Sequence, residues 1–367
     1  MDYLPQRDYC GNYGAIVTEK MLLPPLIPDT KGSGARPYWS VMIPTYNARA
    51  DYLEEALRSV LQQDPGPKQM QIEVVDDCSP HGAPVKLVHR IAGDRVAVHR
   101  EPKNNGLAGI WNRCIERARG EWVHILHQDD VMFPGFYASL HGNIKNMNRV
   151  GAAFCRGLVM DDVGSWLALG DIERPTAGML DGWLPKICES SRILCSSIVV
   201  RRQAYEVVGG FRRDLCFALD WEMWCRLARE FEFWYEPRVM CAYRTHKFST
   251  TSQLAHSGIR VRDTRNAISI ITSYLPPRLR QQIAARTRVT YALAGFNTAT
   301  ALISKGKINE GLAEAWESLK CSQHFSVVRR ALLFCFWVLR RVFGRLLRAR
   351  SRLGKDDASY ISVETRE

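Results

Sequence analysis

Residues 41–47 read Val-Met-Ile-Pro-Thr-Tyr-Asn, and this stretch decides how the chain around it folds. A short apolar run that ends at Pro44 and continues in polar residues predicts a buried strand that stops at the edge of a sheet. The next residues, 51–63, carry apolar side chains at helical spacing, so a helix is expected directly after the strand.

The same pattern returns twice further along the chain. Ile72–Val75 is an apolar run that ends in Asp76 and Asp77, and Trp122–Leu126 ends in the polar run His127–Asp130. Helical spacing at 107–118 separates these strands. Strands that alternate with helices predict an α/β fold with a mostly parallel central sheet flanked by helices.

Three polar clusters follow the three strands: Thr45–Asn47, Asp76-Asp77 and His127–Asp130. Ligands of open α/β sheets bind beyond the carboxyl ends of the strands, so these clusters predict a binding site at one edge of the sheet. The alternative is ordinary turn chemistry, because Asp and Asn favour turns in any case.

Asp129 and Asp130 are adjacent acids at a buried strand end. Two neighbouring carboxylates repel each other and are costly to desolvate, and a divalent cation would relieve both costs. Oxygen ligands suit Mg²⁺ or Mn²⁺, which also bind substrate phosphates. A solvated turn with two acids is the alternative.

Asp220 and His246 are two later candidates for chemistry. Asp220 shares a helix face with Trp224, and burial there would raise its pKa toward the range of a general base. The alternative for Asp220 is a helix N-cap. A neutral His246 imidazole could bind a transition metal, although a lone His more often has a structural role.

Taken together, these positions resemble family 2 of the inverting glycosyltransferases, which has the GT-A fold, over about residues 38–252. The motifs stand in the family's order: Val41–Asn47 (V-I-I-P-T-Y-N), Val74–Ser79 (V-V-D-D-G-S), Asn105-Gly106 with Asn112 and Ala118–Glu121 (N-x-G…N…A-x-G-E), His127–Asp130 (D-x-D-D), and Val208–Phe211 with Asp220–Arg226 (G-G-F…E-D-x-x-L-W-x-R).

The resemblance implies a role for each matching residue. The nucleotide of a sugar donor would be held by Pro44, Thr45, Tyr46, Asp76, Asp77, Asn105, Gly106, Asn112, His127 and Asp129. A Mg²⁺ or Mn²⁺ on the diphosphate would be held by Asp129, Asp130 and His246, the last in a late Y-R-x-H motif. Asp220 would be the catalytic base.

Three positions depart from the family pattern. His127 replaces the first acid of D-x-D-D, Trp111 replaces an Arg, and Leu219 replaces the Glu that usually precedes the catalytic Asp. We expect the His127 change to alter donor geometry or metal affinity, because an imidazole cannot carry the negative charge of a carboxylate.

Charge divides the 367-residue chain into two parts. Residues 255–367 hold 20 Lys and Arg against 8 Asp and Glu, a net charge of +12, whereas residues 1–254 hold 30 of each sign. We expect a poorly ordered arm over 1–36, a GT-A catalytic domain over 37–254 and a basic helical region over 255–367. The neutral catalytic part argues against a nucleic-acid partner.

Residues 327–353 contain eight Arg and no acid among Leu, Phe and Trp. A basic apolar helix of this kind can lie on an anionic membrane, and Phe334 and Trp337 are expected on its Arg-rich face. Packing on the catalytic domain is the alternative. With no signal peptide in the first residues and scattered cysteines, the expected location is the cytoplasm, including the cytoplasmic face of the membrane.

The expected activity is therefore sugar transfer from a nucleotide-sugar, with UDP favoured over dTDP or GDP, to a glycan or lipid-linked acceptor. Two alternatives stay open at this point. One is a nucleotidyltransferase that makes sugar nucleotides, although residues 45–48 lack its Gly- and Arg-rich loop. The other is a non-catalytic membrane- or nucleic-acid-binding protein on the same scaffold. The sequence names neither the sugar nor the acceptor.

Overall fold

The computed structural model describes residues 23–29, 35–249, 254 and 258–341. They fall into two compact units, here called the catalytic unit (to residue 254, and 263–287) and the C-terminal unit (255–262, and 288 onward). The predicted N-terminal arm lies mostly outside the described residues.

The described part of the catalytic unit contains one mixed sheet in the order β3-β2-β1-β4-β9-β6-β10-β5, with β7 beside β6 and β8 beside β10. Its strands are β1 (Trp39–Thr45), β2 (Met70–Asp76), β3 (Ala97–Arg100), β4 (Trp122–Ile125), β5 (Val131–Met132), β6 (Val150–Met160), β7 (Trp166–Leu169), β8 (Gly178–Met179), β9 (Ile198–Arg201) and β10 (Glu232–Arg244). The first four pair in parallel, as the alternating pattern predicts, whereas β9 runs antiparallel to both β4 and β6.

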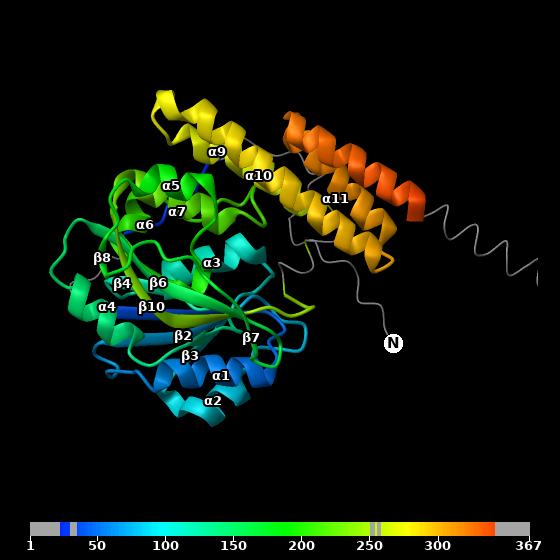
Figure 1. Cartoon of the computed structure of the whole chain (residues 1–367). Coiled ribbons are helices and arrows are strands. Elements are labelled where there is room, and N and C mark those ends of the chain that lie inside the picture. The colour runs from blue at the N-terminus through cyan, green and yellow to red at the C-terminus, as the bar shows by residue number, and fades with distance from the viewer. Residues whose placement is uncertain (1–22, 30–34, 250–253, 255–257, 342–367) are drawn as a thin grey trace, which may run out of the picture. The chain divides into compact units, whose positions relative to one another are not determined.

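Helices cover both faces of this sheet (Figure 1). The helices before β10 are α1 (Ala50–Leu61), α2 (Val85–Ala92), α3 (Gly106–Arg117), α4 (Phe136–Ile144), α5 (Trp183–Glu189), α6 (Arg202–Val208) and α7 (Leu219–Glu230), with 3-10 turns η2 (Gly93–Arg95) and η3 (Cys195–Ser197). After β10 the chain forms α9 (Ile259–Ser273), α10 (Pro277–Ser304) and α11 (Ile308–Cys321). Helices α1 and α2 lie on one face, and α3, α6 and α7 lie on the other.

The core follows from the strand sequences. Val41 and Ile43 of β1 and Val74 of β2 are fully buried in one cluster with Leu53 and Leu57 of α1. The helical stripe predicted for 51–63 therefore covers the strands that precede and follow it, which fixes the carboxyl ends of β1 and β2 at the same edge.

Residues after 262 refine the predicted domain boundary. The carboxylate of Asp263 is fully buried and accepts hydrogen bonds from the backbone N–H groups of Phe217 (2.8 Å) and Ala218 (2.9 Å). Ile268 and Ile271 are also fully buried. Residues 263–287 thus belong with the catalytic unit, although the charge boundary had assigned them to the C-terminal region.

A short N-terminal segment is fixed to the catalytic unit. Pro25 accepts a hydrogen bond from the Gly210 N–H (2.7 Å), Pro28 accepts one from Arg202 (2.9 Å), and Ile27 is buried. Within the stretch expected to be poorly ordered, residues 25–28 therefore contact the catalytic unit, with Ile27 buried.

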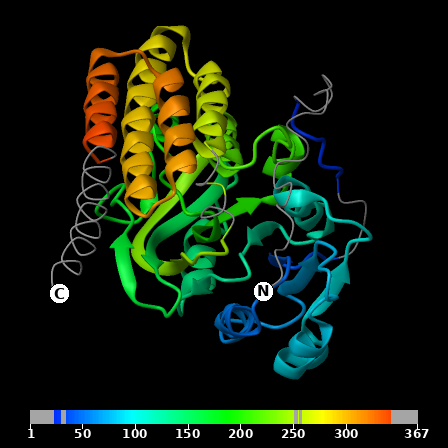
Figure 2. The same cartoon turned by 90° about the vertical axis from the view of Figure 1, so that its right-hand side faces the viewer.

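The C-terminal unit has its own apolar core. Phe296 of α10 packs on Phe334 of an unlabelled helix at 325–341, with ring centroids 5.6 Å apart, and Ala315 of α11 joins the cluster. Figure 2 shows these helices side by side. Among the described helices, none has both the length and the apolar character needed to cross a bilayer.

The cysteines of the described residues are mostly buried free thiols, as the scattered spacing predicts. Cys78 is less buried than expected of a core residue, and Cys216 is disulfide-bonded rather than free. The disulfide at Cys216 departs from the reduced cysteines that the expected cytoplasmic location implies.

Candidate active site

The sheet register brings the three polar clusters to one edge. Thr45 of β1 lies opposite Asp76 of β2, and Met42 of β1 lies opposite Ile125 of β4. Beyond that pair the Leu126 N–H still bonds to the Met42 carbonyl at 3.0 Å. The loops after β1, β2 and β4 therefore leave the sheet side by side.

Hydrogen bonds tie the first of these loops to the other two. The Tyr46 N–H donates to the Gln128 side-chain oxygen at 2.9 Å, and the Asn47 N–H donates to the Ser79 hydroxyl at 2.9 Å. Asn47 has a φ of 47°, in the left-handed region that Asn tolerates better than most residues. The edge is thus a preorganised surface of interlocked loops.

Asp76 and Asp77 organise the second loop. Asp76 is fully buried and accepts from the Ser79 N–H (3.0 Å) and the Thr45 hydroxyl (3.4 Å). Cys78, which stands at the glycine of the family motif, has a φ of 57°. The two acids therefore hold the backbone of this turn, and any donor would meet them in that fixed geometry.

Asp77 also closes the N-terminus of α3. Its carboxylate accepts from the backbone N–H groups of Asn105 (2.7 Å) and Gly106 (3.1 Å), which would otherwise lack partners. Burial raises the pKa of Asp77 in spite of these bonds. A nucleobase N–H would have to share oxygens that already cap a helix, so the nucleobase role of Asp77 stays a prediction.

Asn112 is placed differently from the prediction. It is only 1% exposed, and its amide bonds to the backbone of Phe211 in both directions, at 2.9 and 2.7 Å. The side chain therefore links α3 to the Gly210-Phe211 turn instead of lining a pocket. Sequence spacing could not show this, because the two positions are 99 residues apart.

Two of the departures from the family pattern meet each other. The rings of Trp111 and His127 stack with centroids 5.1 Å apart and planes 21° apart. Trp111 also contacts Phe211 edge to face. An aromatic pair thus stands where the family pattern has an Arg and an Asp.

His127, Asp129 and Asp130 form a cluster that fits a metal ion. One ligand atom from each lies within 4.8 Å of the others. The Nε2 atom of His127 is buried and has no hydrogen-bond partner in the described part of the chain. A buried polar atom without a partner is unfavourable for the folded state, so it calls for a partner such as a proton acceptor or a metal ion. One imidazole nitrogen together with two carboxylates is a ligand set that suits Mn²⁺.

Asp130 is the most enclosed member of this cluster. It is fully buried, accepts from the Arg244 N–H (2.8 Å) and the Ser196 hydroxyl, and lies 3.3 Å from His127 Nδ1. Burial disfavours a charged His127, but its pKa is raised because Cys195 and the Asp130 carboxylate outweigh that effect. The imidazole and the carboxylate therefore stabilise each other's charge.

The end of β10 supplies the remaining partners of Asp129. His246 Nε2 lies 2.8 Å from the Asp129 carboxylate, and Arg244 donates to the Asp129 carbonyl at 3.0 Å. Arg244 is itself held by Glu55 and lies 4.5 Å from the Tyr52 ring centroid. The predicted approach of His246 to Asp129 is thus observed, although nothing tests its role as a metal ligand.

Asp220 stands in the first turn of α7, and it is not the N-cap. The cap position is Ala218, and Asp263 receives the N–H groups there. Asp220 accepts only the neighbouring Trp221 N–H among the bonds found in the described residues (2.7 Å). The N-cap alternative for Asp220 is therefore wrong, because Asp220 lies inside the helix and Ala218 occupies the N-cap position.

The environment of Asp220 suits a general base. The residue keeps part of its surface exposed, but protein surrounds its carboxyl group, and this desolvation raises the pKa to about 6. The charge of His127 acts on the same carboxyl in the opposite direction. The His127 ring is therefore close enough to the Asp220 carboxyl for its charge to act on it.

Several residues of this site were not singled out from the sequence. Arg244 stood inside the Y-R-x-H motif, so that motif could have indicated it. Ser196, Tyr52 and Asp263 carry no local signal, because each acts on a residue more than forty positions away in the chain.

Comparison with known proteins defines the class. Residues 40–208 match the glycosyl transferase family 2 model. The sheet, the strand-end loops and the acidic cluster agree with that match, and together they support a family 2 glycosyltransferase with the GT-A fold. The family predicted from the motifs is therefore confirmed.

Particular relatives extend the match. An uncharacterized protein of Mycobacterium tuberculosis is 28% identical over 263 residues, covering 68% of this chain and 81% of the relative. Succinoglycan biosynthesis protein ExoO of Rhizobium meliloti is 36% identical over 93 residues, covering 25% of this chain and 26% of ExoO. The relatives of this chain therefore include a protein of polysaccharide biosynthesis.

Two solved structures show the same fold. S. aureus TarS 1–349 in complex with UDP-GlcNAc has a TM-score of 0.56 at 16% identity and covers 76% of this chain and 88% of TarS 1–349. The mannosyltransferase PcManGT from Pyrobaculum calidifontis, in complex with GDP-Man and Mn²⁺, has a TM-score of 0.53 at 20% identity, covering 88% and 85%.

Proposed function

We propose that this glycosyltransferase moves a sugar from a nucleoside-diphosphate-sugar to an acceptor hydroxyl, with inversion at the anomeric carbon and with a divalent cation. The observation that carries the proposal is the pairing of a metal-compatible cluster with a half-buried carboxyl whose pKa is raised to about 6. These are the two groups that such a displacement needs.

Asp129 and Asp130 would hold Mg²⁺ or Mn²⁺, with His246 beside Asp129. His127 would offer a ring nitrogen once its imidazole has lost its proton to make room for the cation. The bound ion would supply charge stabilisation to the departing diphosphate. Manganese in the complex of PcManGT with GDP-Man supports this choice.

The donor nucleotide would lie over the interlocked loops after β1 and β2. Pro44, Thr45 and Tyr46 would contact it from one side, and Asp76, Asp77, Asn105 and Gly106 would fix the other. His127 and Asp129 would meet the diphosphate end. We favour UDP, for which UDP-GlcNAc in TarS is the supporting example, with GDP or dTDP as the other candidates.

Asp220 would take the proton of the acceptor hydroxyl. As that proton moves to the carboxylate, the acceptor oxygen bonds to the anomeric carbon from the face opposite the diphosphate, and the bond from that carbon to the diphosphate oxygen breaks. One displacement of this kind inverts the configuration. Trp221 fixes the carboxyl through its N–H, which keeps the second oxygen available.

The acceptor would be a growing polysaccharide, a lipid-linked glycan or a cell-surface glycan, and the protein would work in the cytoplasm or at the cytoplasmic face of the membrane. The place of ExoO in succinoglycan biosynthesis supports the acceptor class. The family assignment argues against synthesis of sugar nucleotides and against a non-catalytic scaffold.

A donor screen tests this function. The protein is incubated with UDP-, GDP- and dTDP-sugars, with Mn²⁺ or with EDTA, and release of nucleoside diphosphate is followed. We expect release from one nucleotide class and loss of release in EDTA, and NMR of the transfer product should show the inverted anomer. No release from any donor would overturn the activity, and a retained anomer would overturn the mechanism.

A further inference from the structure

The helix at 325–341 has an apolar face in solvent. Its exposed large apolar residues are Phe325, Val328, Leu332, Leu333, Phe336 and Leu339. At 100° per residue all of them except Leu333 lie within about 80° of the helix circumference, and Leu333 lies about 60° beyond that stripe. Leu332 and Phe336 are 68% and 66% exposed, so this outer stripe lacks cover among the described residues.

The opposite face of the same helix is packed. Val327 and Phe334 are buried in the C-terminal unit, and Trp337 packs against that cluster. Arg330 bonds to Asn297, and Arg341 bonds to the Ser304 carbonyl. Phe334, Trp337, Arg330 and Arg341 thus share one face, as their spacing predicts, and that face is the packed one. The outer stripe is apolar.

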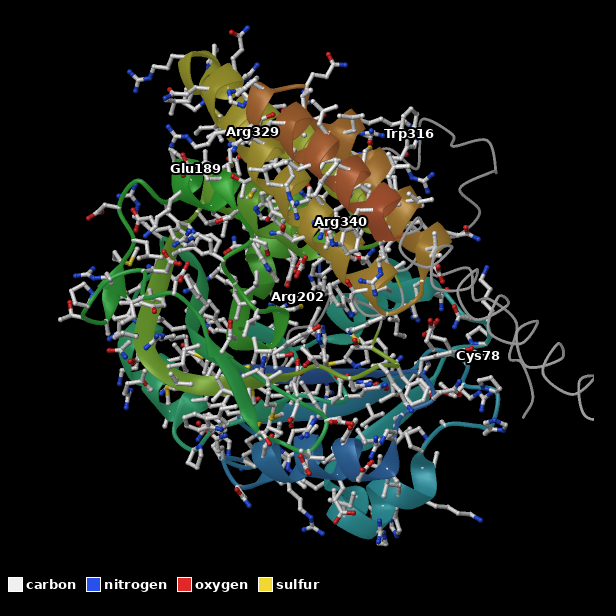
Figure 3. All side chains as sticks on the ribbon, turned by 45° about the vertical axis from the view of Figure 1, so that its right-hand side comes forward. Cys78, Glu189, Arg202, Trp316, Arg329 and Arg340 are labelled. Carbon is white, nitrogen blue, oxygen red and sulfur yellow. The ribbon has the colours of Figure 1, made fainter. Side chains whose placement is uncertain are left out.

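Two arginines border the outer stripe. Arg329 and Arg340, both labelled in Figure 3, are exposed. At helical spacing they lie on one side of the stripe, between it and Leu333. From Ser318 to Lys355 the sequence has ten Lys and Arg and no Asp or Glu. The exposed face of helix 325–341 therefore combines apolar side chains with positive charge, and no residue of this helix is acidic.

This combination selects the kind of partner. A second copy packed face to face would bring arginine beside arginine, and like charges across an interface cost binding energy. A membrane with anionic headgroups accepts both features, because Leu and Phe enter the acyl boundary while Arg meets the phosphates. The described part of helix 325–341 is not long and apolar enough to cross a bilayer.

We propose that the outer stripe of helix 325–341 docks this protein on an anionic membrane surface. The apolar residues supply insertion, and Arg329 and Arg340 supply charge attraction. The proposal is independent of the proposed sugar transfer, since docking requires only the C-terminal unit.

Flotation of the full chain with vesicles tests the proposal. We expect the protein to float with vesicles that contain phosphatidylglycerol and to stay behind with phosphatidylcholine alone. The double variant Leu332→Glu with Phe336→Glu should lose at least about tenfold of the bound fraction, and Arg329→Glu with Arg340→Glu should also lose binding. The control Leu167→Glu removes an equally exposed leucine from β7 and should float like the wild type.

Two results would overturn the proposal. One is unchanged flotation of the Leu332→Glu, Phe336→Glu variant. The other is a wild type that does not float but forms a dimer by light scattering, which the same variant converts to a monomer. Nucleoside diphosphate release in solution, measured on each variant, keeps this outcome separate from the proposed function, and circular dichroism verifies folding.

Discussion

The catalytic unit and the C-terminal unit differ in which of their groups have partners: the polar groups of the sheet edge are hydrogen-bonded, whereas apolar side chains of the C-terminal unit are exposed. At the sheet edge, Tyr46, Asp77 and Asp130 are all engaged by groups from distant segments. On helix 325–341, by contrast, Leu332 and Phe336 stand in water while arginines border them.

This difference indicates what each surface is built to meet. A network of fixed dipoles and carboxylates is preorganised for a small charged ligand, because its orientation needs no further reorganisation. An exposed apolar stripe is unfavourable in water, and it is stabilised when a larger apolar partner covers it. The four predictions below probe the catalytic side of this comparison, and the flotation experiment probes the other side.

The largest expected effect is on turnover. Asp220→Asn should lower the transfer rate by about 10²–10⁴-fold, because the amide cannot accept the acceptor proton. Donor binding, measured by calorimetry with Mn²⁺, should remain close to the wild type. Asp181→Asn, an exposed acid without a site role, serves as the control. Near-normal transfer by Asp220→Asn would remove Asp220 from the mechanism.

The second largest effect is expected on stability, when the Asp263 carboxylate that holds the turn before α7 is removed. Asp263→Ala leaves the N–H groups of Cys216, Phe217 and Ala218 without their carboxylate and should cost about 3 kcal/mol of unfolding free energy, at about 1 kcal/mol for each bond. Urea unfolding measures the change. Asp263→Asn keeps one acceptor oxygen and should lose less. Equal stability of wild type and Asp263→Ala would contradict the capping role.

A smaller effect is expected on metal-dependent donor binding when one of the proposed metal ligands is removed. Asp129→Asn should weaken Mn²⁺-dependent donor binding by about 10–100-fold, the range seen when a metal site loses one supporting group. Calorimetry with Mn²⁺ and with EDTA separates the metal contribution. An Asp129→Asn protein that binds donor equally well in both buffers and as tightly as the wild type would sink the metal assignment.

The smallest expected effect is on stability and its pH dependence. The Asp220 pKa is raised from the model-peptide range to about 6, so the unfolded state loses its proton first as the pH rises. The folded state is therefore penalised progressively between about pH 4 and 6 and fully above it, and no penalty exists below pH 4.

Asp220→Asn should accordingly raise the unfolding free energy at pH 7.5 by about 1–2 kcal/mol, a value reduced for the exposed part of the residue, and leave it unchanged at pH 4. Thermal unfolding at the two pH values measures this. In the wild type, the rate of transfer should rise through pH 6 as the base loses its proton. A variant that is less stable at pH 7.5 would contradict the desolvated carboxyl.

Local sequence patterns were sufficient to predict the parallel strands and the polar loops that follow β1, β2 and β4. Apolar runs that end in polar residues place Thr45, Asp76 and His127 at strand ends, and parallel pairing brings those ends to one edge for geometric reasons. The antiparallel insertion of β9 between β4 and β6 gave no such signal, because Ile198–Arg201 reads like any buried strand.

Sequence patterns alone predict the family, the α/β class, the acids at the strand ends and the basic character of residues 255–367. Three features come from the folded chain: Asp263 holds the turn before α7, Trp111 stacks on His127, and one face of helix 325–341 is exposed. The reason is physical: spacing along the chain fixes which side chains share a face, but the partner of that face comes from segments tens to hundreds of residues away.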